Sequence, residues 1–166
     1  MYEKGNYVVN GNHGICEISD IITMNMGSGD KEYYVLIPIE ESTAKVFLPV
    51  DIAEKRIRPA MNTDDAWKLI HEMKAIDEAL VENEKEREKL YKEAINSRDP
   101  KQLISLLKTL YLRRQKRLEE GKKTTSVDER YFKLAENHLY SELAFALKVD
   151  KSELNQIIEQ NIEMNI

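Results

Sequence analysis

The chain has 166 residues, a formal net charge of −5 at pH 7, 42% hydrophobic residues and 33% charged residues. This length fits one ordinary domain or two small ones, and the apolar content is enough for a core. No apolar run approaches the roughly 18 residues of a membrane span, and the first residues lack the pattern of a secretory signal. The single cysteine, Cys16, cannot form a disulfide within the chain. We therefore expect a cytoplasmic protein without membrane contact.

The chain divides into two parts of different composition. Residues 1–60 hold five of the six glycines, three of the four prolines and nearly all of the alternating apolar runs. Residues 61–166 hold one glycine, one proline and long runs of helical periodicity. This division predicts an α+β protein with a β domain over residues 1–60, a helical domain over residues 61–166 and a hinge at residues 58–63.

Five short strands are predicted in the first part. Asn10-Gly11 after residues 7–9 is a strong turn signal, because both residue types tolerate a positive φ angle. In the next strand Ile15, Glu17 and Ser19 alternate with Cys16, Ile18 and Asp20, as in a half-buried strand. The other strands are expected at residues 32–37, 44–49 and 55–59, with a turn at 27–30 and a short helical turn at 50–54. Such strands with tight turns predict a small, strongly bent antiparallel barrel.

The second part predicts a compact bundle of about five helices. Polar residues mark helix starts at Thr63, Asp99 (followed by Pro100), Ser126 (with Glu129 in a capping box) and Asp150. The second helix covers residues 84–95, and Gly121 ends the third. Apolar residues at helical spacing give each helix a buried stripe. In the first helix this stripe consists of Trp67, Ile70, Met73, Ile76 and Leu80.

Five short motifs follow one another across the first part. They are Lys4-Gly5-Asn6-Tyr7-Val8-Val9, His13-Gly14-Ile15-Cys16-Glu17-Ile18, Glu32-Tyr33-Tyr34-Val35-Leu36, Val46-Phe47-Leu48-Pro49 and Ile57-Arg58-Pro59. In this order they resemble the CarD/CdnL family of bacterial transcription regulators. The same part is similar to the RNA-polymerase-interacting domain of transcription-repair coupling factor. The helical part resembles the CarD C-terminal domain in length and helix rhythm.

The resemblance implies a Tudor-like, SH3-like barrel that docks on the β subunit of RNA polymerase. Pairing of a barrel strand with a polymerase strand uses backbone groups and therefore tolerates changes of side chain. Some family members carry an arginine that contacts polymerase where this chain has Phe47. An apolar contact could replace it, and whether Phe47 supports or prevents polymerase binding stays open. The polymerase-binding residues that we expect are Tyr33, Val35, Lys45, Phe47 and Pro49.

A basic segment lies within the helical part. Residues 83–123 carry 13 Lys and Arg against 7 Asp and Glu. Alternating charges over residues 84–93 favour a solvated helix with ion pairs, whereas residues 113–123 hold six basic residues and two acidic ones, which favours contact with phosphates. No pattern for reading bases is present. The DNA-binding residues that we expect, supported by the resemblance, are Arg87, Lys89, Arg113, Arg114, Lys116, Arg117, Lys122 and Lys123.

Trp67 is the only tryptophan. In several CarD proteins a tryptophan near the start of the second C-terminal helix wedges into the DNA minor groove. The matching position in this chain lies near residues 83–85, which hold no aromatic residue. Because Trp67 falls on the apolar stripe of the preceding helix, we expect it in the core.

His13 and Cys16 are the residues closest to a reactive pair. A thiol nucleophile needs a base, an orienting group and an oxyanion donor, and a zinc site needs more than two such ligands. No Gly-rich phosphate loop precedes a helix. We therefore expect no enzymatic activity, no metal and no cofactor.

These features predict a transcription regulator that works by binding. The barrel would bind RNA polymerase, and the helical domain would contact promoter DNA, weakly and without sequence preference, at the upstream edge of the bubble. The protein would stabilise the open complex by binding it better than the closed one, and would associate with the nucleoid through polymerase. An alternative stays open: a protein–protein adaptor without DNA contact, possible as a monomer or as a domain-swapped dimer because edge strands invite pairing.

Overall fold

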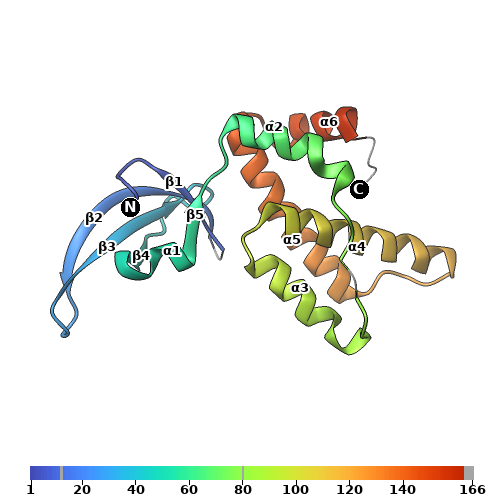
Figure 1. Cartoon of the computed structure of the whole chain (residues 1–166), viewed down its shortest axis with the longest axis horizontal. Helices are drawn as coiled ribbons and strands as arrows, with labels where there is room; N and C mark the ends of the chain where they lie inside the picture. Colours follow the sequence, from blue (N-terminus) through green and yellow to red (C-terminus); the bar gives the residue numbers. More distant parts are fainter. Residues whose placement is uncertain (12, 80, 163–166) are drawn as a thin grey trace. The chain divides into compact units, whose positions relative to one another are not determined.

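The computed structural model describes residues 1–11, 13–79 and 81–162 and divides the chain into two compact units, Met1–Ala60 and Met61–Ile166 (Figure 1). Each unit has its own hydrophobic core. None of the helices in the described ranges is long and apolar enough to cross a membrane.

The first unit is a five-stranded antiparallel sheet with the strand order β4-β3-β2-β1-β5. Figure 1 shows that the long strands β2 and β3 curve strongly. The predicted Tudor-like architecture is confirmed, with β4 and β5 as the two edges of a sheet that does not close into a full barrel. The strands are β1 (Tyr7–Asn10), β2 (Gly14–Asn25), β3 (Asp30–Pro38), β4 (Val46–Pro49) and β5 (Ile57–Pro59), and η1 (Val50–Ile52) and α1 (Ala53–Arg56) join β4 to β5.

A β-bulge bends the sheet around its core. Ile18 lies opposite Leu36, but Asp20 lies opposite Val35, so Ser19 is the extra residue of β2. The Ser19 hydroxyl donates a hydrogen bond to the Val35 carbonyl at 3.2 Å. A bulge bends its strand and increases the local twist, which lets β2 and β3 curl over the core. That core consists of Val8, Cys16, Ile18, Tyr34, Leu36, Leu48, Ala53 and Ile57, and the predicted burial of Cys16 is confirmed.

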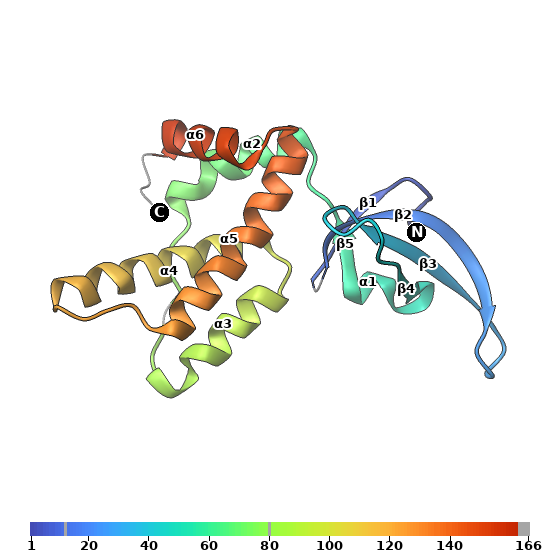
Figure 2. The same ribbon diagram turned by 180° about the vertical axis from the view of Figure 1, so that it is seen from behind.

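In the described residues, the second unit forms a bundle of five α-helices, as predicted. They are α2 (Thr63–Glu72), α3 (Arg87–Asn96), α4 (Pro100–Glu119), α5 (Ser126–Leu147) and α6 (Lys151–Ile162), with 3₁₀ turns η2 (Met73–Ala75) and η3 (Glu84–Glu86). α5 contacts α2, α3, α4 and α6, and the view from behind in Figure 2 shows it running through the bundle. The largest fully buried side chains of this core are Ile70, Tyr91, Ile104, Leu107, Leu139, Leu143 and Leu154.

Two helix caps are confirmed. Asp99 caps α4, because its Oδ1 atom accepts a hydrogen bond from the Lys101 N–H at 2.9 Å. Asp150 caps α6 in the same way, with the Glu153 N–H at 2.7 Å. These side chains satisfy backbone donors that the first turn of a helix leaves without intrahelical partners.

The other two predicted caps are wrong by one position. Asn62 caps α2 in place of Thr63, and Thr125 caps α5 in place of Ser126. Thr63 has a different role, since its hydroxyl donates to the Ala146 carbonyl at 2.9 Å and ties the start of α2 to the end of α5.

The first helix is shorter than predicted, and Trp67 is not in the core. α2 and η2 end by Ala75, where the Lys108 ammonium of α4 donates hydrogen bonds to the carbonyls of Met73, Lys74 and Ile76. Leu80, the last member of the predicted stripe, lies outside the described residues. The buried side chains of this segment are Ala66, Leu69, Ile70 and Met73. Trp67 is 36% exposed and stacks on His71 with ring centroids 6.1 Å apart, so its predicted burial is wrong.

Candidate functional site

The five residues expected to bind polymerase, Tyr33, Val35, Lys45, Phe47 and Pro49, lie together on β3 and β4 or directly beside them. In the antiparallel register Tyr33 lies opposite Pro49, and Val35 lies opposite Phe47. Side chains alternate between the two faces of a sheet, so these four share the face opposite to that of Tyr34 and Leu48. Lys45 precedes β4 and is exposed. We call these five residues the β3–β4 patch.

The β3–β4 patch lies at an open edge of the sheet. No strand of the described residues pairs with the outer side of β4. Phe47, in the middle of this strand, is 47% exposed, whereas Val35 opposite it is buried. An edge strand presents backbone donors and acceptors to a further strand, and an exposed aromatic ring beside it offers an anchor. The arrangement suits the addition of one strand from a protein partner.

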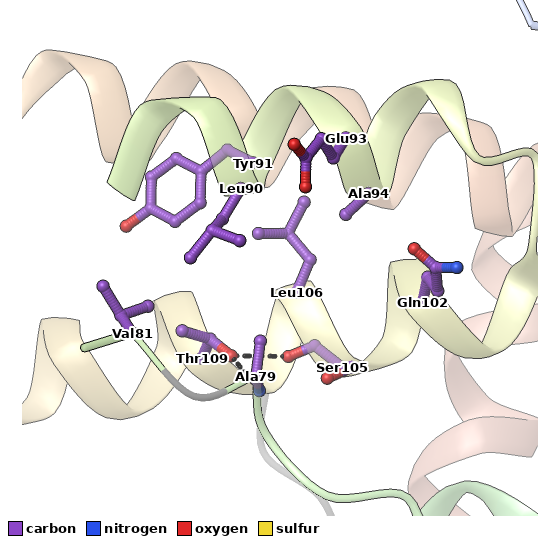
Figure 3. Close-up of a pocket in the computed structure, with 10 residues that line it drawn as sticks. All are labelled: Ala79, Val81, Leu90, Tyr91, Glu93, Ala94, Gln102, Ser105, Leu106 and Thr109. Carbon is purple, nitrogen blue, oxygen red and sulfur yellow. Dashed lines mark hydrogen bonds between the residues drawn. The ribbon is translucent and has the colours of Figure 1, made fainter. Parts of the chain in front are cut away.

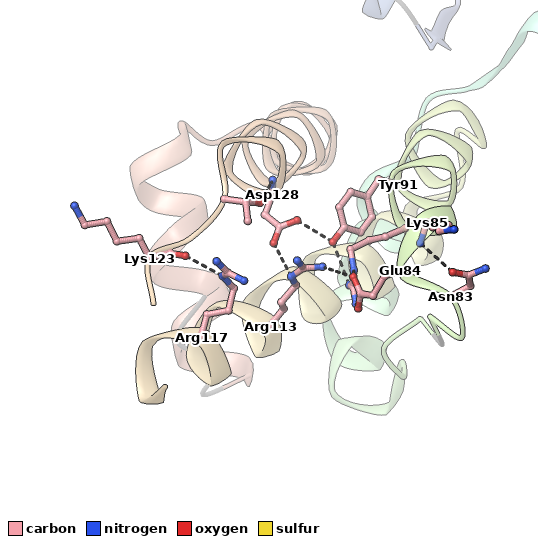
Figure 4. A network of polar contacts seen from close by, with 10 residues as sticks. Asn83, Glu84, Lys85, Tyr91, Arg113, Arg117, Lys123 and Asp128 are labelled. Atoms are coloured by element: carbon pink, nitrogen blue, oxygen red, sulfur yellow. Dashed lines mark hydrogen bonds and ion pairs between the residues drawn. The ribbon is translucent and has the colours of Figure 1, made fainter. Parts of the chain in front are cut away.

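The eight basic residues expected to contact DNA lie in two different environments. Arg87 and Arg113 are partners in a polar network that joins η3, α3, α4 and α5 (Figure 4). The other six are exposed or partly exposed. They lie on α3, at the end of α4 and in the loop after it, and they are Lys89, Arg114, Lys116, Arg117, Lys122 and Lys123.

Asp128 and Glu84 are the two carboxylates of this network. Asp128, with only 5% of its side chain exposed, accepts a hydrogen bond from the Tyr91 hydroxyl at 2.9 Å and contacts Arg113 Nε at 2.9 Å. Glu84 binds Arg87 through both carboxylate oxygens, at 2.6 and 2.8 Å, and contacts Arg113 at 3.4 Å. Arg113 therefore bridges the two carboxylates and holds the start of α5 to α4.

The guanidinium groups fix the charge of Glu84. Hydrogen bonding to Arg87, assisted by the charge of Arg113, lowers the pKa of Glu84 to about 2, and the same contact raises the pKa of Arg87. Glu84 is therefore ionised throughout the neutral pH range. Burial raises the pKa of Tyr91, so its phenol stays protonated and can donate to Asp128.

Sequence reasoning missed the roles of Asp128 and Tyr91. Asp128 belongs to the predicted capping box at residues 126–129, and it also lies three, four and seven residues before Tyr131, Phe132 and Ala135 on the inner side of α5. An acidic residue in line with such an apolar stripe signals a buried carboxylate that needs a partner.

The end of α4 carries the accessible cations. The structure gives no ion pair for Arg114 or Lys116 within the described ranges, whereas Lys122 pairs with Glu120 at 3.4 Å. Arg117 Nε donates to the Lys123 carbonyl at 2.8 Å and holds the loop after Gly121 against the helix. Surface charges of this kind are available to phosphates, because an exposed ion pair contributes little stability.

A small pocket lies between α3, α4 and the residues Ala79 and Val81 (Figure 3). Its volume is about 160 Å³, and its walls are mainly apolar, with Leu90 and Leu106 among them. Thr109 accepts a hydrogen bond from the Ala79 N–H at 2.8 Å, which holds this wall to α4. The pocket is smaller than the sites that usually take small-molecule ligands, so we assign no substrate to it.

Cys16 is placed as a core residue. Its side chain is fully buried, burial raises the pKa of its thiol to about 11, and His13 is exposed on a turn. Within residues 1–11, 13–79 and 81–162, no three His, Cys, Asp or Glu residues group as metal ligands.

We expect the folded protein to resist alkylation of Cys16 by iodoacetamide at pH 8. Alkylation requires the thiolate, and a thiol with a pKa of about 11 is ionised in only about one molecule in a thousand at this pH. Mass spectrometry should show little label on the native chain and full label after unfolding in urea. Equal labelling rates in both states would contradict the burial of this thiol.

Two families of domains match the chain. Residues 2–61 match the family described as CarD-like/TRCF RID domain, and residues 68–159 match the family described as CarD, C-terminal domain. No curated protein matches the sequence. The first match covers the β3–β4 patch, and the second covers the network and the basic end of α4.

Proposed function

From the premise that this chain belongs to the CarD family of RNA-polymerase-interacting transcription factors, we propose that it docks on the β subunit through the β3–β4 patch and contacts promoter DNA through the end of α4. The family is non-enzymatic. The contact with DNA would lie at the upstream edge of the bubble and stabilise the open complex.

The observation that carries the docking proposal is the exposed Phe47 on the open edge strand β4. A polymerase strand added to β4 would satisfy its outer backbone groups, as in other complexes formed by strand addition. Phe47 would then become a buried aromatic anchor, and Lys45 would supply a charge at the rim of the interface.

The DNA proposal is supported by local charge. The whole chain carries a net charge of −5, which repels phosphate, so any affinity has to come from a local concentration of cations. Arg114, Lys116 and Arg117 on α4, followed by Lys122 and Lys123, provide that concentration. Binding of this kind is independent of sequence and falls steeply with salt.

The two contacts together give a mechanism. Polymerase bound to the first unit holds the second unit beside the promoter and raises its effective concentration there, so that weak phosphate contacts become significant. The protein then favours the open complex to the extent that these contacts are better in the open complex than in the closed one.

The alternative function is that of a protein–protein adaptor without DNA contact. The specific observation in its favour is that Arg87 and Arg113, two of the eight expected DNA ligands, are partners of acidic side chains within the bundle.

We expect Arg114→Gln combined with Lys116→Gln to shorten the lifetime of open promoter complexes. Each lost phosphate contact should flatten the dependence of log affinity on log salt by about 0.9. Open-complex lifetimes are measured with polymerase, promoter DNA and the full-length protein over a range of salt concentrations. The matched control, Lys68→Gln with Lys151→Gln, changes the charge equally at exposed positions of α2 and α6. Equal lifetimes for both double variants at every salt concentration would leave the adaptor function as the better account.

A further inference from the structure

We propose that Arg87 and Arg113 form a phosphate-binding site in which the Glu84 carboxylate occupies the place of a DNA phosphate until DNA displaces it. This inference rests on the proposed contact with promoter DNA and adds a competitor for it within the protein. The observation behind it is that both guanidinium groups converge on one carboxylate.

The geometry of Glu84 is that of a bound anion. One carboxylate oxygen contacts Arg87 at 2.6 Å, and the other lies 2.8 Å from Arg87 Nε and 3.4 Å from Arg113. A phosphodiester also presents two charged oxygens, and arginine binds carboxylate and phosphate through the same pair of parallel N–H groups. A backbone phosphate of DNA can therefore take the same donors.

Glu84 can leave this position without disturbing the core. Its side chain is 72% exposed and stands on the single 3₁₀ turn η3, which Asn83 caps through the Lys85 N–H at 3.0 Å. A rotation of the side chain toward solvent is enough to release both arginines. Because the carboxylate itself is largely exposed, water replaces its contacts when it turns away, which lowers the cost of releasing it.

The two arginines stay in position when Glu84 leaves. Asp128 holds Arg113 at 2.9 Å from the other side, and the Tyr91 hydroxyl accepts a hydrogen bond from Arg87 at 3.3 Å. The side chain of Arg87 is only 17% exposed with Glu84 in place. A guanidinium that is mostly covered and has lost its carboxylate gains more from a phosphate than a fully solvated one does.

In the free protein, Glu84 therefore occupies the two arginines. They become available to DNA only where the local phosphate concentration is high. Free protein would bind duplexes through the surface cations alone. When polymerase holds the helical unit beside the promoter, phosphate competes more successfully with Glu84 for the two arginines.

The test compares Glu84→Gln with Glu86→Gln. Both substitutions remove one negative charge from η3, and for Glu86 the structure gives no ion pair within the described residues. Binding of a random-sequence duplex to each full-length variant is followed by fluorescence anisotropy over a salt series. We expect E84Q to bind the duplex roughly three- to tenfold more tightly than E86Q, with a salt slope steeper by about 0.9 for each phosphate gained.

A second measurement locates the contact. Adding the duplex to E84Q should shift the ¹⁵N resonances of the Arg87 and Arg113 side chains, and the double variant E84Q/R87Q should lose the gain in affinity. Equal affinities for E84Q and E86Q, or a gain that survives in E84Q/R87Q, would overturn the inference, as would the absence of duplex binding by E84Q at low salt. Failure of the proposed function would give a different result: the double variant Arg114→Gln with Lys116→Gln would bind the duplex as tightly as the wild type does.

Discussion

Replacing Asp128 by alanine is expected to lower the free energy of unfolding of the helical unit by about 3 kcal/mol. The carboxylate is almost fully buried and serves two partners, the Tyr91 hydroxyl and the Arg113 guanidinium. Its removal leaves a cation that is only 21% exposed without its closest counter-ion, together with a buried phenol without its acceptor. Leaving buried polar groups without partners costs more than the bonds themselves contribute.

Urea denaturation followed by circular dichroism measures this loss. The matched control is Glu129→Ala, one residue later in the first turn of α5 and exposed. There the substitution removes only a favourable interaction with the helix dipole, worth about 0.3–1 kcal/mol. Similar losses for both variants would contradict a structural role for the Asp128 contacts.

The same substitution separates stability from docking. The β3–β4 patch belongs to the first unit, which has its own core, and Asp128 belongs to the second. A chain with a destabilised helical unit should therefore still bind polymerase, while the proposed stabilisation of the open complex should be lost.

The β unit could be predicted closely from the sequence because its signals are local. Ile18 lies between the polar residues Glu17 and Ser19, and Asn10-Gly11 favours a tight turn whatever lies elsewhere in the chain. The bulge at Ser19 was not predicted, because it is defined by the register with β3, and a register is not visible in one strand. For the same reason the sequence did not indicate that the sheet stays open between β4 and β5.

The first helix shows where helical periodicity is ambiguous. Trp67, Ile70 and Met73 have helical spacing, but Ala66, Leu69, Ile70 and Met73 have it equally well. The predicted stripe did not include Ala66, which is small, although this residue is fully buried in the core. The end of this segment depends on Lys108, a partner more than thirty residues away, which no local pattern can indicate.

In the basic segment, too, the sequence alone could not identify which residues form the functional surface. Composition identified a local excess of cations but could not say which of them have acidic partners. Arg113 lies 29 residues from Glu84 and 15 from Asp128, and only the folded bundle brings these three together. The end of α4 was easier to interpret, since residues 113–118 contain no acidic residue.

Phe47→Ala is expected to weaken binding to RNA polymerase by roughly ten- to hundredfold, the usual effect of losing an aromatic anchor at the centre of an interface. The ring is 47% exposed in the free protein, so its loss should change the stability of the sheet little. The backbone of β4 would still pair with an added strand, which is why some binding should remain.

The control for Phe47→Ala is Ile52→Ala, which truncates another exposed apolar side chain of the same unit, in η1 and outside the β3–β4 patch. Equilibrium binding of each full-length variant to purified polymerase is measured without DNA, so that phosphate contacts by the helical unit cannot compensate. Melting temperatures of both variants show whether the sheet is intact.

A folded F47A that bound like the wild type, with I52A as the weaker binder, would move the docking surface from β4 to the η1 side of the unit. A result in which both variants bind like the wild type would contradict the role of Phe47 as the anchor of this interface.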